Sequence, residues 1–256
     1  MHPHVTSMDK SLTARLHRFA AARVSPEEEF GLHLTVGVLV LLLAMAGFAR
    51  IAGAVVAGAP ITQLDVDLAN WLHVHAHGND ALRSALMVLT LVHSTPGVLA
   101  LTALAGWWLV RRGARHWMLT LLVTVPGGMV LNVLMKHTFE RARPHFDEPI
   151  LTLSTYSFPS GHTVAATLLY GLLACYLVRH ARGWGARAGW TLLACLMILL
   201  VAGSRLYLGA HYLSDVLAAM AEGCAWLSIC VTGVATLRRR QAARARRATI
   251  NLSEKS

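Results

Sequence analysis

The sequence predicts an all-α fold: an integral membrane bundle of six transmembrane helices with both termini in the cytoplasm. Hydrophobic residues make up 55% of the 256-residue chain and charged residues only 14%, whereas a soluble domain carries roughly 25% charged residues. The apolar residues form long runs, and short arginine-rich blocks separate those runs. Helix is the expected state, because unpaired backbone groups are costly in hydrocarbon and a closed barrel would show alternation instead.

Six of the apolar runs are candidates for crossing the bilayer. They cover residues 31–49, a run that ends at 110 and begins either near 84 or after 96, and residues 117–135, 163–178, 188–203 and 216–237. Several are shorter than the ~20 residues that one crossing needs. We therefore expect their ends to extend into the flanking polar residues.

The placement of the basic residues predicts the orientation of the bundle. In a six-span topology, four groups of lysines and arginines fall on one side, within residues 10–23, 111–115, 179–187 and 238–247. That side is expected to be cytoplasmic, because short cytoplasmic loops are enriched in lysine and arginine. The connections 57–83, 136–162 and 204–215 are then expected on the outer, extracytoplasmic side of the membrane.

The formal net charge of +10 is high enough to suggest a nucleic-acid partner. The basic residues, however, form short blocks at the ends of apolar runs, which is typical of membrane orientation and contact with anionic headgroups. We therefore expect a multi-pass protein of the cell (cytoplasmic) membrane whose partners are the bilayer and a lipid within it, and no nucleic acid.

The predicted domain organisation is simple. Residues 1–30 are expected to form a cytoplasmic amphipathic segment, residues 31–237 the six-span domain, and residues 238–256 a basic cytoplasmic tail. The four cysteines lie inside apolar runs without Cys-x-x-Cys spacing, so neither a zinc site nor a disulfide framework is indicated. Three histidines (His73, His75 and His77) lie in a stretch expected to be an interfacial helix, where a metal site is the less favoured interpretation.

Three polar stretches at the edges of the apolar runs contain the candidate functional residues. Lys136, Arg143 and Arg205 supply fixed positive charge, and guanidinium groups bind phosphate oxygens in pairs. The segment 159–162 reads Pro-Ser-Gly-His at the start of the fourth span, where free backbone amides make a ready anion site. His211 and Asp215 are four residues apart, so a carboxylate can orient an imidazole nitrogen for attack.

Each stretch has a less specific interpretation when taken alone. Ser160 and Gly161 can form a simple helix cap, and His211 with Asp215 can be a surface pair on one helix. Arg141 is a possible fourth cation, although a solvated or headgroup-binding role is the favoured interpretation. Glu222 lies inside the sixth span, where a functional role and a hydrogen-bonded packing role are equally expected. Cations outnumber carboxylates around these stretches, so we expect phosphate-ester chemistry without a metal or other cofactor.

The order and spacing of the three stretches resemble the type 2 phosphatidic acid phosphatase superfamily, which also includes vanadium haloperoxidases. The chain reads KHTFERARP at 136–144, PSGH at 159–162 and SRLYLGAHYLSD at 204–215, and every position of the family signature is filled. The resemblance implies that His211 is the nucleophile, Asp215 orients it and His162 is the general acid. It also implies a phosphate site formed by Lys136, Arg143, Ser160, Gly161 and Arg205.

The resemblance therefore predicts a lipid phosphatase. It would hydrolyse a phosphomonoester or terminal diphosphate outside the membrane through a phosphohistidine. Undecaprenyl diphosphate, phosphatidic acid, phosphatidylglycerophosphate and lipid A phosphates are all compatible with the motifs. Three alternatives stay open: a lipid phosphotransferase that passes the phosphoryl group to an alcohol, a vanadate-dependent peroxidase, and a transporter or structural scaffold. The six spans argue against the peroxidase, and a scaffold leaves the motif spacing unexplained.

Overall fold

The computed structural model describes residues 31–253, and all regular structure in that range is helical. The amphipathic segment predicted within residues 1–30 lies outside the described residues. The helices are α2 (Leu32–Val56), α3 (Pro60–His77), α4 (Asp80–Val92), α5 (Thr95–Arg111), α6 (Arg115–Phe139), α7 (Gly161–His180), α8 (Trp184–Tyr207) and α9 (Leu213–Ser253). The predicted all-α fold is thereby confirmed.

The described helices include five that are long and apolar enough to cross a membrane: α2, α6, α7, α8 and the first 33 residues of α9. A sixth crossing is available if α4 and α5 act as one broken span, since together they pass the same test but bend by 62°. The break explains why two starting points were open for the second run. Next to the break, position 97 must be glycine, because a Cβ atom there would lie 2.1 Å from the Val92 carbonyl oxygen.

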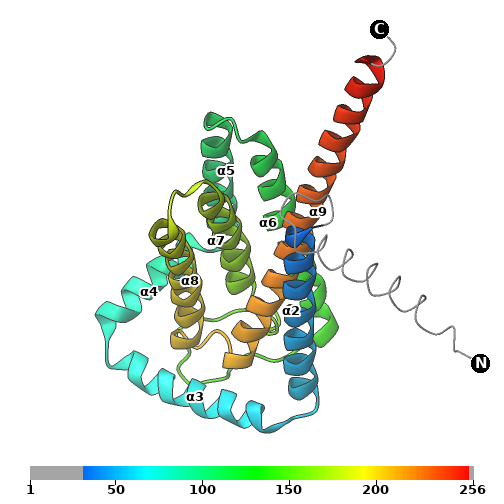
Figure 1. Ribbon diagram of the computed structural model, residues 1–256. Coiled ribbons are helices and arrows are strands. Elements are labelled where there is room, and N and C mark those ends of the chain that lie inside the picture. The colour runs from blue at the N-terminus through cyan, green and yellow to red at the C-terminus, as the bar shows by residue number, and fades with distance from the viewer. Residues whose placement is uncertain (1–30, 254–256) are drawn as a thin grey trace, which may run out of the picture. The chain divides into compact units, whose positions relative to one another are not determined.

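The chain divides into two compact units, one of which covers residues 41–227. Within this unit, α3 lies crosswise at one end of the helices α6, α7 and α8, as Figure 1 shows. Aromatic rings of Phe48, Phe139 and Phe158 pack together there with centroids 5.0 to 6.0 Å apart. This core anchors the 140–160 loop, because Phe158 is fully buried immediately before the PSGH segment.

The other unit comprises, within the described range, residues 31–40 of α2 and 228–253 of α9. The two helix segments approach closely at Gly37, where a side chain would lie 2.0 Å from the Thr232 hydroxyl oxygen. His33 Nε2 also lies 3.4 Å from Thr236 Oγ1. Helix α9 continues well beyond residue 237, where the sixth run was expected to end, because the alanine- and arginine-rich sequence that follows favours helix.

The connections between the helices of residues 41–227 lie at two opposite ends of the bundle. The 140–160 loop and the turn at 208–212 lie at the same end as α3, whereas the arginine-bearing connections 112–114 and 181–183 lie at the opposite end (Figure 1). All three sequence motifs are therefore gathered at the α3 end of the bundle.

Candidate functional site

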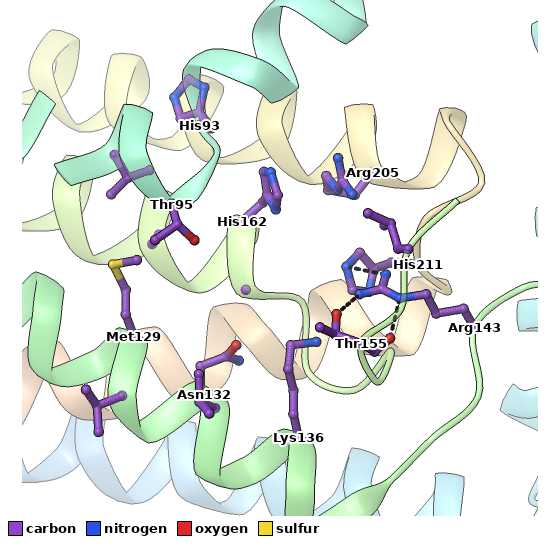
Figure 2. Close-up of a pocket in the computed structure, with 16 residues that line it drawn as sticks. His93, Thr95, Met129, Asn132, Lys136, Arg143, Thr155, His162, Arg205 and His211 are labelled. Atoms are coloured by element: carbon purple, nitrogen blue, oxygen red, sulfur yellow. Dashed lines mark hydrogen bonds between the residues drawn. The ribbon is translucent and has the colours of Figure 1, made fainter. Parts of the chain in front are cut away.

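A cavity of about 420 Å³ lies where the three motifs meet. Six of the eight candidate residues line it, from α6, α7, α8 and the two loops: Lys136, Arg143, Gly161, His162, Arg205 and His211. The other two, Ser160 and Asp215, are fully buried behind its wall. Figure 2 shows Lys136 facing His162 and Arg205 across the cavity, with Arg143 and His211 together at one end. The structure therefore brings all eight residues into one place.

Arg143 is held by neutral acceptors. Its Nε donates to the Thr155 carbonyl at 2.6 Å and its Nη1 to the Ala210 carbonyl at 2.6 Å. Its Nη2 donates to the Thr155 hydroxyl at 2.9 Å and to the Tyr156 carbonyl at 3.2 Å. Burial lowers the pKa of Arg143, although the charge of nearby Asp215 opposes that shift. The loop thus fixes the guanidinium while leaving its charge unpaired by any carboxylate hydrogen bond, which is the condition for binding an anion.

Lys136 and Arg205 are held in the same way. Lys136 Nζ donates to the Tyr156 carbonyl at 2.5 Å, and Arg205 Nη1 donates to the Thr90 hydroxyl. Arg205 is only 2% exposed, and its Nε is buried without a hydrogen-bond partner among the described residues. Because buried guanidinium nitrogens are normally hydrogen-bonded, an orphaned one beside a cavity indicates a site for an acceptor. Phosphate oxygens are acceptors of this kind.

The PSGH segment forms a turn that starts α7. Helix α7 begins at Gly161, so its first amides are at the cavity wall. Ser160 makes no capping hydrogen bond; instead it accepts a 3.0 Å bond from the Thr163 hydroxyl. The simple cap is therefore not what the structure shows. A side chain at position 161 would lie 3.1 Å from Asn132 Oδ1, so glycine keeps this wall open.

His211 and Asp215 are in contact at the other side of the cavity. His211 Nδ1 lies 3.3 Å from Asp215 Oδ2, and Arg143 Nη1 lies 3.2 Å from His211 Nε2. Since a guanidinium can only donate, Nε2 is the accepting nitrogen and Nδ1 carries the proton toward the carboxylate. Burial lowers the pKa of His211 to about 3, even though Asp215 acts to raise it. The ring is therefore neutral at ordinary pH, and its Nε2 lone pair accepts from Arg143 at the cavity wall.

Behind His211, Asp215 is held by a second polar cluster that spacing alone did not predict. Its Oδ2 also accepts bonds from the Ser157 hydroxyl and, at 2.9 Å, from the Tyr212 amide. Its Oδ1 accepts a 2.6 Å bond from Arg141 Nη1. We call the group Asp65, Arg141, Ser157, Ser214 and Asp215 the rear cluster.

The favoured expectation for Arg141, a solvated or headgroup-binding side chain, is wrong. The side chain is 14% exposed and bridges two fully buried carboxylates, with Nη2 at 2.8 Å from Asp65 Oδ2 and Nη1 at 2.6 Å from Asp215 Oδ1. Burial opposes its charge, but the two carboxylates raise the pKa of Arg141 overall. The position of Arg141 on the outer side of the predicted topology indicated a local anionic partner but did not identify it. In the structure that partner is Asp65 of α3.

The general-acid candidate His162 lies beside the break between α4 and α5. The backbone of Thr90 is within hydrogen-bonding reach of its ring, and His93 from the break lines the same cavity. His93 is anchored to α7 by a 2.7 Å contact with the Tyr170 hydroxyl and to its own helix by a 2.8 Å contact with the Leu89 carbonyl. Sequence reasoning missed Thr90 and His93, because no motif covers this segment; the sequence Ser94-Thr95-Pro96-Gly97 was the available signal of a break.

Glu222 is hydrogen-bonded inside the bundle. Its Oε2 accepts a 3.1 Å bond from Asn132 Nδ2, which also donates to the Pro159 carbonyl at 3.3 Å. Its Oε1 is buried without a hydrogen-bond partner. The pair thus links α6 and α9 to the PSGH turn. Within residues 31–253 no group of three metal-ligating side chains is arranged around a common point, and this includes the described histidines of α3.

These features define a class: a helical multi-pass membrane protein with a cavity lined by two arginines, a lysine and three histidines at one end of its spans. Residues 117–239, which include all three motifs, match the model described as the PAP2 superfamily.

One curated sequence and one solved structure, both from Bacillus subtilis, are similar to this chain. One, from strain 168, is named phosphatidylglycerophosphatase B; it is 32% identical over a segment that covers 43% of this chain and 64% of that relative. The chain thus matches somewhat less than two thirds of the relative's length. The other is a crystal structure titled as a transmembrane PAP2-type phosphatidylglycerolphosphate phosphatase. It aligns with a TM-score of 0.66 and 26% identity, covering 75% of this chain and 94% of that one.

Proposed function

We propose that the protein is an integral-membrane lipid phosphatase that works through a phosphohistidine and needs no metal ion. The observation that carries the proposal is the contrast between three cations bound only to neutral acceptors and a neutral histidine that stands among them with a carboxylate behind it. A phosphate dianion is the kind of ligand that such an arrangement would bind.

The chemistry follows from the positions of the two histidines. His211 Nε2 attacks phosphorus, and the bond from phosphorus to the ester oxygen breaks as His162 gives a proton to that oxygen. The alcohol leaves, and a phosphoryl group remains on His211. Water then attacks phosphorus and gives its proton to His162, which releases inorganic phosphate and restores both residues. Lys136, Arg143 and Arg205 hold the equatorial oxygens throughout, and Asp215 stabilises the positive charge that develops on the ring.

An ester with an apolar tail fits the remainder of the cavity. Beyond His162 its lining is largely aliphatic: Val98, Met129, Val130, Val133 and Ala165. Tail contacts of this kind suit a membrane lipid, and the names of the Bacillus subtilis relative and of the solved structure put phosphatidylglycerophosphate first among the substrates to test. Other lipid monophosphates and prenyl diphosphates share the terminal phosphate that the cations would bind.

We further propose that the site faces outside, with both termini in the cytoplasm, on the basis of the arginine-rich connections at the opposite end of the bundle. Glu148 and Arg182 are exposed in connections at opposite ends, so single cysteines at these positions test the orientation once the native cysteines are replaced. An impermeant thiol reagent should label E148C in intact cells and R182C only after permeabilisation. The reverse pattern would invert the topology.

Turnover in detergent against a panel of lipid phosphates, with excess EDTA, tests the activity directly. We expect release of inorganic phosphate from at least one lipid, without an added alcohol and at the same rate with and without chelator. Phosphate transfer that appears only with an acceptor alcohol would indicate a phosphotransferase. Inhibition by EDTA that Mg²⁺ reverses would contradict the metal-free mechanism.

A further inference from the structure

We propose that Arg141 and Asp65, neither of which belongs to the three motif signatures, are positioning residues that hold Asp215 in the orientation needed to act on His211. The inference rests on the proposed phosphatase function. It concerns how the nucleophile is prepared, whereas the cations of the cavity concern how phosphate is bound.

The first argument is that both oxygens of Asp215 have assigned partners. Oδ2 faces His211 Nδ1 at 3.3 Å and also accepts from Ser157 and the Tyr212 amide. Oδ1 is bound by Arg141 Nη1 at 2.6 Å. A carboxylate that is bonded at both oxygens cannot rotate about its last side-chain bond without breaking a charge-assisted hydrogen bond. Arg141 thereby decides which Asp215 oxygen is presented to the nucleophile.

The second argument is that Asp65 holds Arg141 in place. Asp65 comes from α3 and is fully buried. Its Oδ2 accepts from Arg141 Nη2 at 2.8 Å and from the Ser214 hydroxyl at 2.5 Å, while its Oδ1 accepts from the Ser214 amide at 2.9 Å. Ser214 directly precedes Asp215, so one carboxylate from a distant helix fixes both the backbone before Asp215 and the guanidinium that binds it.

The third argument concerns charge. Asp65 and Asp215 are two buried carboxylates, and Arg141 is the cation that pairs with both. Without Arg141, the charge of Asp215 would still act on Arg143, which contacts His211 from the cavity side. Pairing Asp215 with Arg143 would remove positive charge from the phosphate site. Arg141 thus separates the carboxylate that orients the nucleophile from the cations that bind substrate.

Further contacts keep Arg141 rigid. Its guanidinium carbon lies 4.4 Å from the centre of the Tyr212 ring, and its Nη1 also donates to the Ser214 hydroxyl at 2.6 Å. Its own carbonyl accepts a 2.8 Å bond from the Ser157 amide. Residue 157 therefore contacts both members of the Arg141–Asp215 pair: its amide binds the Arg141 carbonyl, and its hydroxyl binds the Asp215 carboxylate.

The test compares R141Q, R141K and D65N with the wild-type protein on whichever lipid phosphate gives turnover. We expect kcat to fall about 100-fold in R141Q and about tenfold in D65N, because orientation of the reacting group is lost. KM and inhibition by inorganic phosphate should stay within about twofold, since the cavity cations are untouched. R141K should recover part of kcat, because an ammonium keeps the charge but cannot bridge two carboxylates with paired nitrogens.

D67N is the matched control. Asp67 lies on the same helix as Asp65, but it is exposed and bonds only to Gln63 in the described structure, at 2.8 Å. We expect D67N to retain wild-type kcat and KM. A loss in D67N equal to that in D65N would mean that α3 tolerates no such change, and would contradict a specific role for Asp65.

A double-mutant cycle separates positioning from general stabilisation. If Arg141 acts through Asp215, adding R141Q to D215N should lower kcat by less than about threefold, whereas the two losses would otherwise multiply. Multiplying losses, or a rise in KM that equals the fall in kcat, would overturn the proposal. A wild-type protein without phosphate release on any lipid would instead defeat the proposed function, so the two failures are distinguishable.

Discussion

Two polar regions meet at His211, and they handle charge in opposite ways. On the cavity side, Lys136, Arg143 and Arg205 donate their hydrogen bonds to carbonyl and hydroxyl oxygens. In the rear cluster, Arg141 donates to two carboxylates, although it lies only two residues from Arg143 in the sequence. The comparison teaches that an arginine's function here depends on whether its acceptors are neutral: those with neutral acceptors stay available for a ligand, and the one with carboxylates organises the protein.

The largest expected effect comes from the residue that joins the two regions. H211A should lower phosphate release by roughly 10⁴-fold or more, because covalent catalysis and the orientation by Asp215 are lost together. Lipid-phosphate turnover in detergent measures the loss, and size-exclusion chromatography checks that the variant inserts and folds. Wild-type turnover by H211A would remove His211 as the nucleophile and, with it, the reason to compare the two regions.

His162 tests the cavity side separately from the rear cluster, because its proposed role is to donate a proton, whereas Asp215 orients His211. H162A should lower turnover of a lipid phosphate by about 10²- to 10⁴-fold. The loss should shrink strongly with a nitrophenyl phosphate, since a stable phenolate leaves without a proton. An equal loss on both substrates would contradict the role of His162 as the acid. Asp215, in the rear cluster, supplies the control: D215N should lower both rates alike.

Arg143 tests whether neutral acceptors mark a phosphate-binding cation. R143Q should weaken inhibition by inorganic phosphate about 10- to 100-fold, which corresponds to the loss of charge-assisted hydrogen bonds to a phosphate oxygen. R141Q is the natural comparison, since it removes an arginine from the same loop and should leave phosphate inhibition nearly unchanged. The comparison of the two regions fails if both variants weaken inhibition to the same degree.

A smaller effect is expected at Thr90, which binds Arg205 from the broken span. T90V keeps the shape of the side chain but removes the hydroxyl acceptor, and phosphate inhibition should weaken about tenfold. T102V is the matched control, because the Thr102 hydroxyl is likewise buried but has no hydrogen-bond partner. Equal behaviour of the two valine variants would show that α4 does not help to hold Arg205.

Six residues that line the cavity were predicted from the three sequence motifs, because the chemistry constrains them locally. His211 and Asp215 are four residues apart and Arg143 directly precedes Pro144, so their relative geometry can be inferred from the sequence. Asp65 could not be predicted as their partner, because 149 positions separate it from Ser214 and only tertiary packing brings them together. The same holds for Thr90, which reaches Arg205 across 115 positions.

For the fold, the membrane spans could be predicted from the sequence, but the break at His93 could not. Apolar runs identified the spans because hydrocarbon imposes a uniform requirement along each of them. The break at His93 was visible only as an uncertain starting point, since whether a proline and a glycine end a span or bend it depends on neighbouring helices. The contacts of His93 with Tyr170 show how α7 supports the bend.

The position of Asp65 also bears on how small a working fragment of this protein can be. The family match begins at residue 117 and includes every motif residue. It therefore suggests a segment that could be expressed or transplanted by itself. A shortened chain that began there would lack α3, and with it the oxygen acceptors of the Ser214 amide and of one Arg141 nitrogen. Transplants and deletions that respect the motif boundaries would therefore remove a structural part of the site without touching any signature residue.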